Sequence, residues 1–457
     1  MLLFAALMTA TTDDRLGKSP DRVQWGFRVA LALVVAIRVW NAIAYDPRWQ
    51  QGAKIHLGYL RDLAYLRVPA SYNGPWNYLL TLFLSAPVAV PLALLGVEDT
   101  ALLHASLGFV QTILFAFLLV GCYRMGRKLW GPELGLRFTV LVGAFPVVQR
   151  IQSMVRPENL LFVLTPWAIL LYLRIAPQAN QSIRKLVRYV PYLALVLAQA
   201  LIVAQKISGV VILGTLPAFL VRTRIGLKDS IRLLLKVVPA VLFLAMLLIG
   251  VQALLTGRTP FRHDVSSNEQ SFCAEGFRPA PVSFFLSFQP SLAWNEPFRD
   301  AHRGSMPGIL FVDFYGDYWR RGFDALHLER TEGMRLSRAR YGVVLSACFG
   351  LLWLVSSATV LFSKSAAAPT ERRNLFAAAM CLLGCALFLC AASLKYYCPE
   401  DGDIAKWEYV VWACVFLPIP LISAMRVLSL EKAKVYEAAL LALTLAGLVQ
   451  CIVTPLF

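Results

Sequence analysis

The sequence contains few charged residues for its length. Asp, Glu, Lys and Arg make up 16% of the 457 residues, whereas 58% are hydrophobic. This composition excludes an ordinary soluble domain and is typical of a polytopic membrane protein. Acidic residues are fewer than basic residues: 27 Asp and Glu stand against 44 Lys and Arg, which gives a net charge of +17. The basic residues cluster between apolar runs, so they indicate cytoplasmic anchors and lipid contacts and no nucleic-acid partner.

Several motifs of soluble enzymes are also missing. The sequence has no CxxC, no Cys/His cluster, no Gly-rich phosphate loop and no Ser/His/Asp order. It therefore predicts no metal site and no cofactor, and leaves a divalent cation open. Most of the nine cysteines lie in apolar runs, where buried thiols are expected. Cys273 and Cys398 lie in polar loops predicted to share one side of the membrane, so in an oxidising compartment they either form a disulfide or stay reduced.

Twelve apolar runs approach the length of a membrane span. If all twelve crossed, the basic loops would alternate against the positive-inside rule. If the run at 78–96, which contains Pro87 and Pro91, does not cross, the basic loops share one side and about eleven spans remain. We therefore expect an all-α polytopic protein with about eleven transmembrane helices, a cytoplasmic N-terminus and a re-entrant or interfacial element at 78–96.

The non-cytoplasmic side is then predicted to hold four polar segments, at 46–75, 150–159, 256–340 and 395–406. Residues 46–100 form the first outer loop, with amphipathic juxtamembrane helices, and residues 256–340 form a large outer loop. The second is rich in Trp, Tyr, Phe, Pro and Gly, which favours an ordered structure over a disordered linker. No internal repeat is evident and no soluble domain is expected after the last span, so residues 1–457 are predicted to form a single integral-membrane domain.

The first outer loop carries a candidate catalytic residue. Asp46 directly follows the first apolar run. It is either an exposed loop residue or, if the following helix lies flat on the membrane above a cavity, a carboxylate that faces the substrate. His56 and Tyr59 lie on that helix and are candidate substrate contacts. His56 has no second ligand nearby, which favours a hydrogen-bonding role over a metal site.

A second candidate group comes from two later segments. Arg156 precedes Pro157 and Glu158 at the start of an apolar run. Arg156 is either a snorkelling anchor or a ligand contact, and Glu158 would lie near the positive end of a helix dipole. Lys206 has apolar neighbours on both sides and is costly in a membrane unless it pairs with an anion or reaches water. An anionic ligand group would be a natural partner.

Two aromatic segments complete the candidates. The segment FYGDYWRR contains Asp317 among aromatic residues and arginines, a pattern that suits sugar rings but also an interfacial aromatic belt. Lys395, Tyr397 and Lys406 lie in a loop whose cations suit a phosphate and whose aromatic residues suit membrane anchoring equally well.

These motifs, in this order, resemble the C-type glycosyltransferase superfamily, in the branch of aminoarabinose transferases and protein mannosyltransferases. The resemblance lies in DPRWQQGAKIHLGYLRDL, NGPWNYLL, CYRMGRKLWGPELGL, RIQSMVRPENLLF and AQKISGVVILG, and covers roughly residues 20–220. It implies Asp46 as the catalytic carboxylate, Arg156 and Glu158 as a second site in an outer loop, and Lys206 as a cavity residue. Gly52-Ala53-Lys54 stands where relatives often carry an acidic residue. Asp317 and Glu296 are therefore alternative candidates for the catalytic base.

The expected activity is transfer of a sugar from a polyprenyl-phosphate donor to a hydroxyl of a glycan, lipid or protein acceptor, with inversion and with Asp46 as general base. The expected location is a bacterial inner or plasma membrane, with the active site on the periplasmic or extracellular face. The alternative is a flippase or transporter of lipid-linked sugars, which would share the buried Lys206 but should show inverted repeats.

Overall fold

The fold is seen in a computed structural model of the chain. It describes residues 22–44, 91, 94–96, 101–154, 158–175, 185–206, 208–223, 226–256, 278–315, 332–398 and 407–452. Every regular element in these ranges is helical, and one isolated β-bridge joins Arg278 to Tyr397. The predicted all-α class is confirmed.

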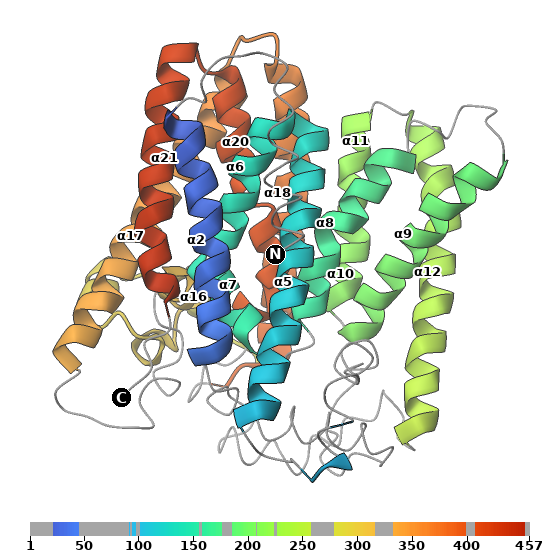
Figure 1. The fold of residues 1–457 in the computed structure, drawn as a ribbon, viewed down its shortest axis with the longest axis horizontal. Coiled ribbons are helices and arrows are strands. Elements are labelled where there is room, and N and C mark those ends of the chain that lie inside the picture. Colours follow the sequence, from blue (N-terminus) through green and yellow to red (C-terminus); the bar gives the residue numbers. More distant parts are fainter. Residues whose placement is uncertain are drawn as a thin grey trace.

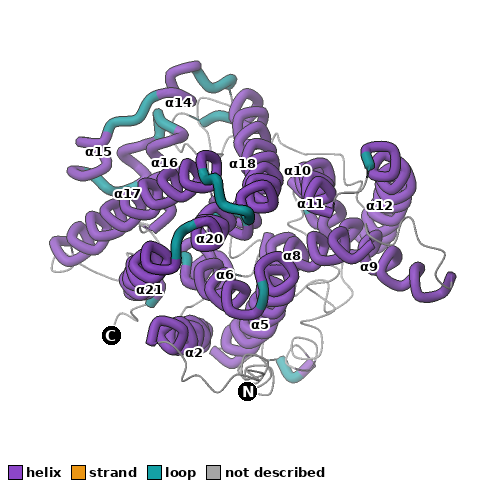
Figure 2. The backbone as a smooth tube through the Cα atoms, turned by 90° about the horizontal axis from the view of Figure 1, so that it is seen from above, coloured by secondary structure: helices purple, strands orange, loops and turns teal. Residues whose placement is uncertain are grey.

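The centre of the bundle is a short helix that is buried along most of its length. Every residue from Gly135 to Ala144 in this helix, α6, is buried, because four neighbouring helices pack around it. Figure 2 shows α6 enclosed by α2, α5, α20 (Pro418–Val427) and α21 (Leu430–Cys451). The helices of this half are α2 (Arg22–Ala44), α5 (Ala101–Trp130), α6 (Pro132–Ala144), α7 (Pro146–Ser153) and α8 (Glu158–Ile175).

A second group of helices extends from α8 and forms the side drawn in green in Figure 1. Its elements are α9 (Lys185–Gln205), α10 (Ser208–Thr215), η3 (Leu216–Phe219), α11 (Leu220–Thr223) and α12 (Leu227–Thr256). Helix α12 packs on α9 and exposes large apolar side chains, including Phe243, Leu247 and Leu254. Exposed apolar residues along a long helix are expected where lipid is the solvent.

Residues 278–315, the described part of the predicted large outer loop, form four short helical elements. These are α14 (Val282–Leu286), α15 (Pro290–Asn295), η4 (Arg299–His302) and α16 (Met306–Tyr315). Helix α16 packs against α7 and α17. The remaining helices are α17 (Glu332–Phe362), α18 (Ala368–Tyr396), α19 (Trp407–Val410), η5 (Val411–Val415), α20 (Pro418–Val427) and α21 (Leu430–Cys451).

The number of spans in the described residues is lower than the sequence predicts. Seven helices are long and apolar enough to cross a membrane by length and composition, or eight if α6 and α7 form one bent span. The other predicted spans in this part of the chain correspond to shorter apolar helices within 190–205, 208–223 and 411–427. The chain is an integral membrane protein, and the count of eleven stays a prediction.

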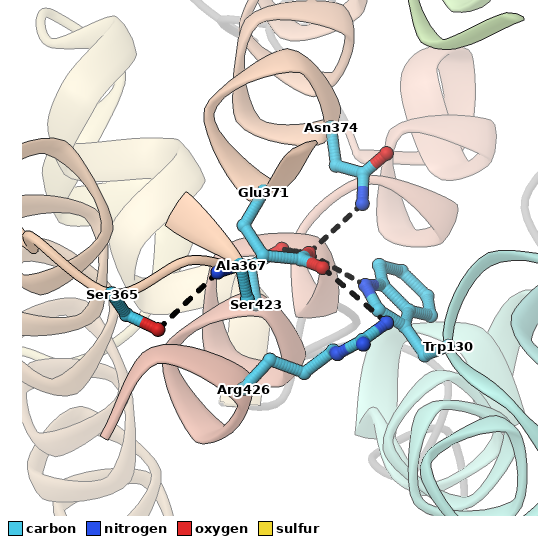
Figure 3. A network of polar contacts seen from close by, with 7 residues as sticks. All are labelled: Trp130, Ser365, Ala367, Glu371, Asn374, Ser423 and Arg426. Atoms are coloured by element: carbon cyan, nitrogen blue, oxygen red, sulfur yellow. Dashed lines mark hydrogen bonds and ion pairs between the residues drawn. The ribbon is translucent and has the colours of Figure 1, made fainter. Parts of the chain in front are cut away.

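A buried carboxylate holds three helices together at one end of the bundle (Figure 3). Glu371, in the first turn of α18, is fully buried, and its Oε2 accepts hydrogen bonds from Trp130 Nε1 of α5, Asn374 Nδ2 of α18 and Ser423 Oγ of α20, at 2.8, 2.9 and 2.8 Å. Arg426 NH1 lies 3.7 Å from its Oε1. These contacts bring together the basic segments that end α5 and α20 and begin α18, as the positive-inside argument requires.

Candidate functional site

Two helix interruptions meet beside each other in the interior of the protein. Helix α7 ends at Ser153 and α8 begins at Glu158, whereas α9 ends at Gln205 and α10 begins at Ser208. Lys206, between α9 and α10, donates a hydrogen bond from Nζ to Glu158 Oε1. Each charge also suits its helix end, because the first turn of α8 favours an anion and the C-terminal end of α9 favours a cation.

This ion pair is buried. Lys206 is 8% exposed and Glu158 is 3% exposed. Nζ of Lys206 also lies 4.2 Å from the centre of the Tyr409 ring, a cation–π contact that adds to the neutralisation of the ammonium. An intramembrane charge is costly without such partners. Lys206 is therefore bound by two side chains from segments far from it in the sequence.

The segment that carries Tyr409 is fixed against the large outer loop. Trp407 Nε1 donates a hydrogen bond of 2.7 Å to the carbonyl oxygen of Leu310, and its ring lies 5.0 Å from the ring of Phe314, both on α16. The same helix carries Asp313, a buried carboxylate that is 1% exposed. The outer loop thus packs onto the layer that contains the ion pair.

A layer of buried amides continues from Glu158 toward α5 and α7. Asn159 Nδ2 donates hydrogen bonds to Gln111 Oε1 at 2.9 Å and to the carbonyl oxygen of Met154 at 2.6 Å. Gln152 Nε2 donates to Asn159 Oδ1 at 3.4 Å. Neighbouring residues of a helix point about 100° apart, so Glu158 and Asn159 face different sides of α8. Glu158 forms the ion pair, and Asn159 forms the hydrogen bonds of the amide layer beside it.

The structure places only some of the predicted site residues. Asp46, His56, Tyr59, Arg156, Asp317 and Lys406 lie outside the described residues, and their roles stay predictions. Glu158 and Lys206, predicted separately, are brought together. Lys395 is exposed near the end of α18.

Two other candidates lie in surroundings that indicate structural contacts. Tyr397 is buried, its ring lies 4.7 Å from that of Phe284, and its carbonyl oxygen accepts a 3.1 Å hydrogen bond from the Arg278 amide. Glu296, the alternative base, is an exposed residue after α15, and its carbonyl oxygen contacts His302 Nε2 at 3.2 Å. Burial lowers the pKa of His302, and Glu296 opposes this shift.

Sequence reasoning missed Asp313 and the partners of Lys206. Asp313 directly precedes the segment FYGDYWRR, and a carboxylate beside an apolar run is as clear a signal in the sequence as Lys206. Tyr409 gave no signal beyond that of an interfacial aromatic residue.

The cysteine prediction is supported at one of its two positions. Cys398 is disulfide-bonded, and seven other cysteines are free thiols. Residue 273 lies outside the described ranges, so its identity as the partner stays a prediction. In the part of the chain that the structure describes, no group of three or more His, Cys, Asp or Glu residues could hold a metal ion.

Comparisons with known proteins give little further information. No protein-family model and no characterised protein sequence matches the chain. Among solved structures, 98% of the chain aligns with the arabinosyltransferase EmbB from Mycobacterium smegmatis, at 13% sequence identity and a TM-score of 0.33. The chain spans 43% of the length of that protein. A similarity of this size does not establish a common fold or activity.

Proposed function

We propose that this protein is a membrane glycosyltransferase that uses a polyprenyl-phosphate-linked sugar. The observation that carries the proposal is the buried group of Lys206, Glu158 and Tyr409 at two adjacent helix interruptions. Ionisable residues inside a membrane bundle are rare and costly, and they commonly mark a ligand site. Irregular backbone at that depth is likewise tolerated where it lines a cavity or is buried in protein.

The chemistry of this group suits a sugar. A carboxylate accepts hydrogen bonds from sugar hydroxyl groups, an ammonium donates to them, and an aromatic ring offers an apolar face. Because Glu158 already neutralises Lys206, we assign this pair to the polar sugar end of the donor. The donor's hydrocarbon tail would lie among the apolar helix surfaces.

The proposed reaction is a direct displacement at the anomeric carbon. Asp46 takes the proton of the acceptor hydroxyl as its oxygen attacks that carbon. The bond from the anomeric carbon to the phosphate oxygen breaks, polyprenyl phosphate leaves, and the anomeric configuration inverts. A general base of this kind contributes about 10²–10⁴-fold to the rate. The acceptor would be a glycan, lipid or protein at the non-cytoplasmic face.

The experiment is transfer from a radiolabelled polyprenyl-phosphate sugar by protein in nanodiscs. We expect Asp46→Asn to abolish transfer and Lys206→Met or Glu158→Gln to reduce it at least tenfold. Asp229→Asn is the matched control, because the Asp229–Arg232 pair on α12 is partly exposed. Transfer that is undiminished in Asp46→Asn would remove the base assignment.

A flippase is the alternative function, and the same preparation tests it. In proteoliposomes, a flippase would move the labelled donor between leaflets and leave its sugar–phosphate bond intact. Movement without sugar transfer to any acceptor would contradict the glycosyltransferase proposal.

A further inference from the structure

Helix α2 contains a fully buried arginine in the same layer as the candidate site. Arg38 is 0% exposed. It lies six residues before the end of α2, a distance of about 9 Å along the helix. Its NH1 donates a 2.5 Å hydrogen bond to Ser153 Oγ, and its NH2 contacts the carbonyl oxygen of Gly108 at 3.4 Å. Both acceptors are neutral.

The backbone around Arg38 is closely packed. A Cβ atom at Gly108 of α5 would lie 2.7 Å from the carbonyl oxygen of Ala42 on α2. The two helices therefore cross with their backbones nearly in contact, and this crossing brings the Gly108 carbonyl to the guanidinium. Ser153 in turn donates to the Gln149 carbonyl oxygen at 2.8 Å, so its hydroxyl is fixed in place. Arg38 thus has a defined position between α2, α5 and α7.

The charge of Arg38 is not balanced within the described residues. In those ranges it makes no ion pair, and its buried Nε has no hydrogen-bond partner. Two buried amide oxygens of α7, Oε1 of Gln149 and Oε1 of Gln152, are also without partners there. Arg137 provides the contrast. It is nearly as buried, but its guanidinium lies 3.0 Å from Glu437 and 3.8 Å from Glu133.

We propose that Arg38 binds the phosphate group of the lipid-linked donor. The inference rests on the proposed function and assigns the phosphate to Arg38, whereas the sequence offered Lys206 as the partner of an anionic ligand group and Lys395 and Lys406 as cations that suit a phosphate. A phosphate beside Lys206 would meet the carboxylate of Glu158, which already neutralises that ammonium. A phosphate beside Arg38 meets a positive charge that no described carboxylate balances, and a planar guanidinium suits its paired oxygens.

The two sites adjoin the same connection between α7 and α8. Arg38 contacts Ser153, the last residue of α7, and Glu158 is the first residue of α8. Asn159, which follows Glu158, donates a hydrogen bond to the carbonyl oxygen of Met154, which follows Ser153. The phosphate would therefore bind on the α2 side of the α7–α8 connection and the sugar on the α9 side.

The test is a binding measurement on wild type, Arg38→Met and Arg137→Met in nanodiscs. The probes are polyprenyl phosphate, the corresponding polyprenol, inorganic phosphate and the anionic lipid phosphatidylglycerol. We expect wild type to prefer polyprenyl phosphate over polyprenol, and Arg38→Met to lose about tenfold to hundredfold of its affinity for polyprenyl phosphate alone. Arg137→Met, where it folds, should keep that affinity. Its apparent melting temperature should fall because the ion pairs of Arg137 with Glu437 and Glu133 are lost, whereas that of Arg38→Met should not.

The outcomes separate the two proposals. A folded Arg38→Met protein with wild-type affinity for polyprenyl phosphate would overturn the Arg38 assignment alone. If Arg38→Met does not fold, Arg38→Lys should still bind about fivefold or more weakly, and wild-type affinity in that variant would overturn the assignment. Tighter binding of inorganic phosphate or phosphatidylglycerol than of polyprenyl phosphate would also overturn it. Equal binding of polyprenyl phosphate and polyprenol by wild type would instead contradict the donor class of the proposed function.

Discussion

At the scale of single residues, a buried lysine needs an anion, and the chain supplies one from a distant helix. Taking both charges out of water costs several kcal/mol per ion, and the mutual attraction recovers this only with close geometry. Lys206 and Glu158 have such close geometry, since they share a hydrogen bond, and the Tyr409 ring adds a cation–π contact to the ammonium. Removing one partner is then worse than removing both, because the remaining charge stays buried after the opposite charge is lost.

We therefore predict non-additive effects of substitutions at this pair. Glu158→Gln should lower the free energy of unfolding by about 3–5 kcal/mol. The double variant Glu158→Gln/Lys206→Met should recover a large part of this loss. Denaturant unfolding in detergent measures both. Asp229→Asn, from the partly exposed pair on α12, should change stability by about 1 kcal/mol or less. Additive losses in the double variant would show that the two charges do not stabilise each other.

The pair also shows what the sequence can and cannot predict about the site. An isolated lysine in an apolar run is visible in the sequence, and so is a glutamate at a helix start. Their contact depends on which helix ends meet in space, which no local pattern encodes. The same holds for Tyr409, which comes from a segment 203 residues after Lys206.

A second prediction concerns His302 in the outer loop. Burial is the main cause that lowers the pKa of His302 from its usual value of 6.5, so the folded protein favours the neutral ring. The unfolded chain binds this proton first as the pH falls, so His302 should reduce stability progressively below about pH 6.5. Hydrogen exchange of residues 296–308 should rise between pH 7.5 and 5.5 after correction for intrinsic rates. The rise should be smaller in His302→Gln, and an identical rise in that variant would exclude His302 as its cause.

At the scale of elements, the predicted runs that lie within the described residues correspond to helices, and a proline explains where one of them bends. One of the twelve apolar runs begins near Gly131, and the chain bends by 63° within it, between α6 and α7. Pro146 at this break cannot donate a backbone hydrogen bond and clashes with the preceding turn. Gln149 Nε2 donates a 2.8 Å hydrogen bond to the carbonyl oxygen of Gly143. This bond satisfies a backbone acceptor at the end of α6 that the bend leaves without its helical partner.

The α9–α10 interruption depends on one glycine. A Cβ atom at Gly209 would lie 2.2 Å from the carbonyl oxygen of Ile202. The Gly209 amide donates a 2.8 Å hydrogen bond to the carbonyl oxygen of Lys206. Gly209→Ala should therefore push α9 and α10 apart, displace Lys206, and lower the free energy of unfolding by about 1–3 kcal/mol. We expect sugar transfer to fall with it.

Gly214→Ala provides the matched control on the same helix. A Cβ atom there meets nothing within 4 Å, so stability should stay unchanged or rise by up to about 1 kcal/mol. Denaturant unfolding curves of the two variants and of wild type measure this difference in the free energy of unfolding. Equal stability of Gly209→Ala and Gly214→Ala would show that the junction tolerates the added methyl group.

At the scale of the whole molecule, two independent features indicate the same orientation in the membrane. The basic segments that end α5 and α20 and begin α18 meet at Glu371. Cys398, which is disulfide-bonded, follows the other end of α18. The 29 residues of α18 extend about 43 Å, more than the hydrocarbon core of a bilayer. Basic segments favour the cytoplasmic side, and disulfides form in oxidising compartments.

We predict that the end with Glu371 is cytoplasmic and that the outer loop with α14–α16 faces outward. Ala366 is exposed in the turn before α18, and Ser291 is exposed on α15, whose Trp294 carbonyl oxygen binds Arg340 near the start of α17. In a Cys348→Ser background, which removes an exposed thiol, a membrane-impermeant maleimide should label Ser291→Cys in intact cells. Ala366→Cys should react only after permeabilisation. The reverse pattern would place the basic end outside, and with it the proposed sugar transfer on the cytoplasmic face.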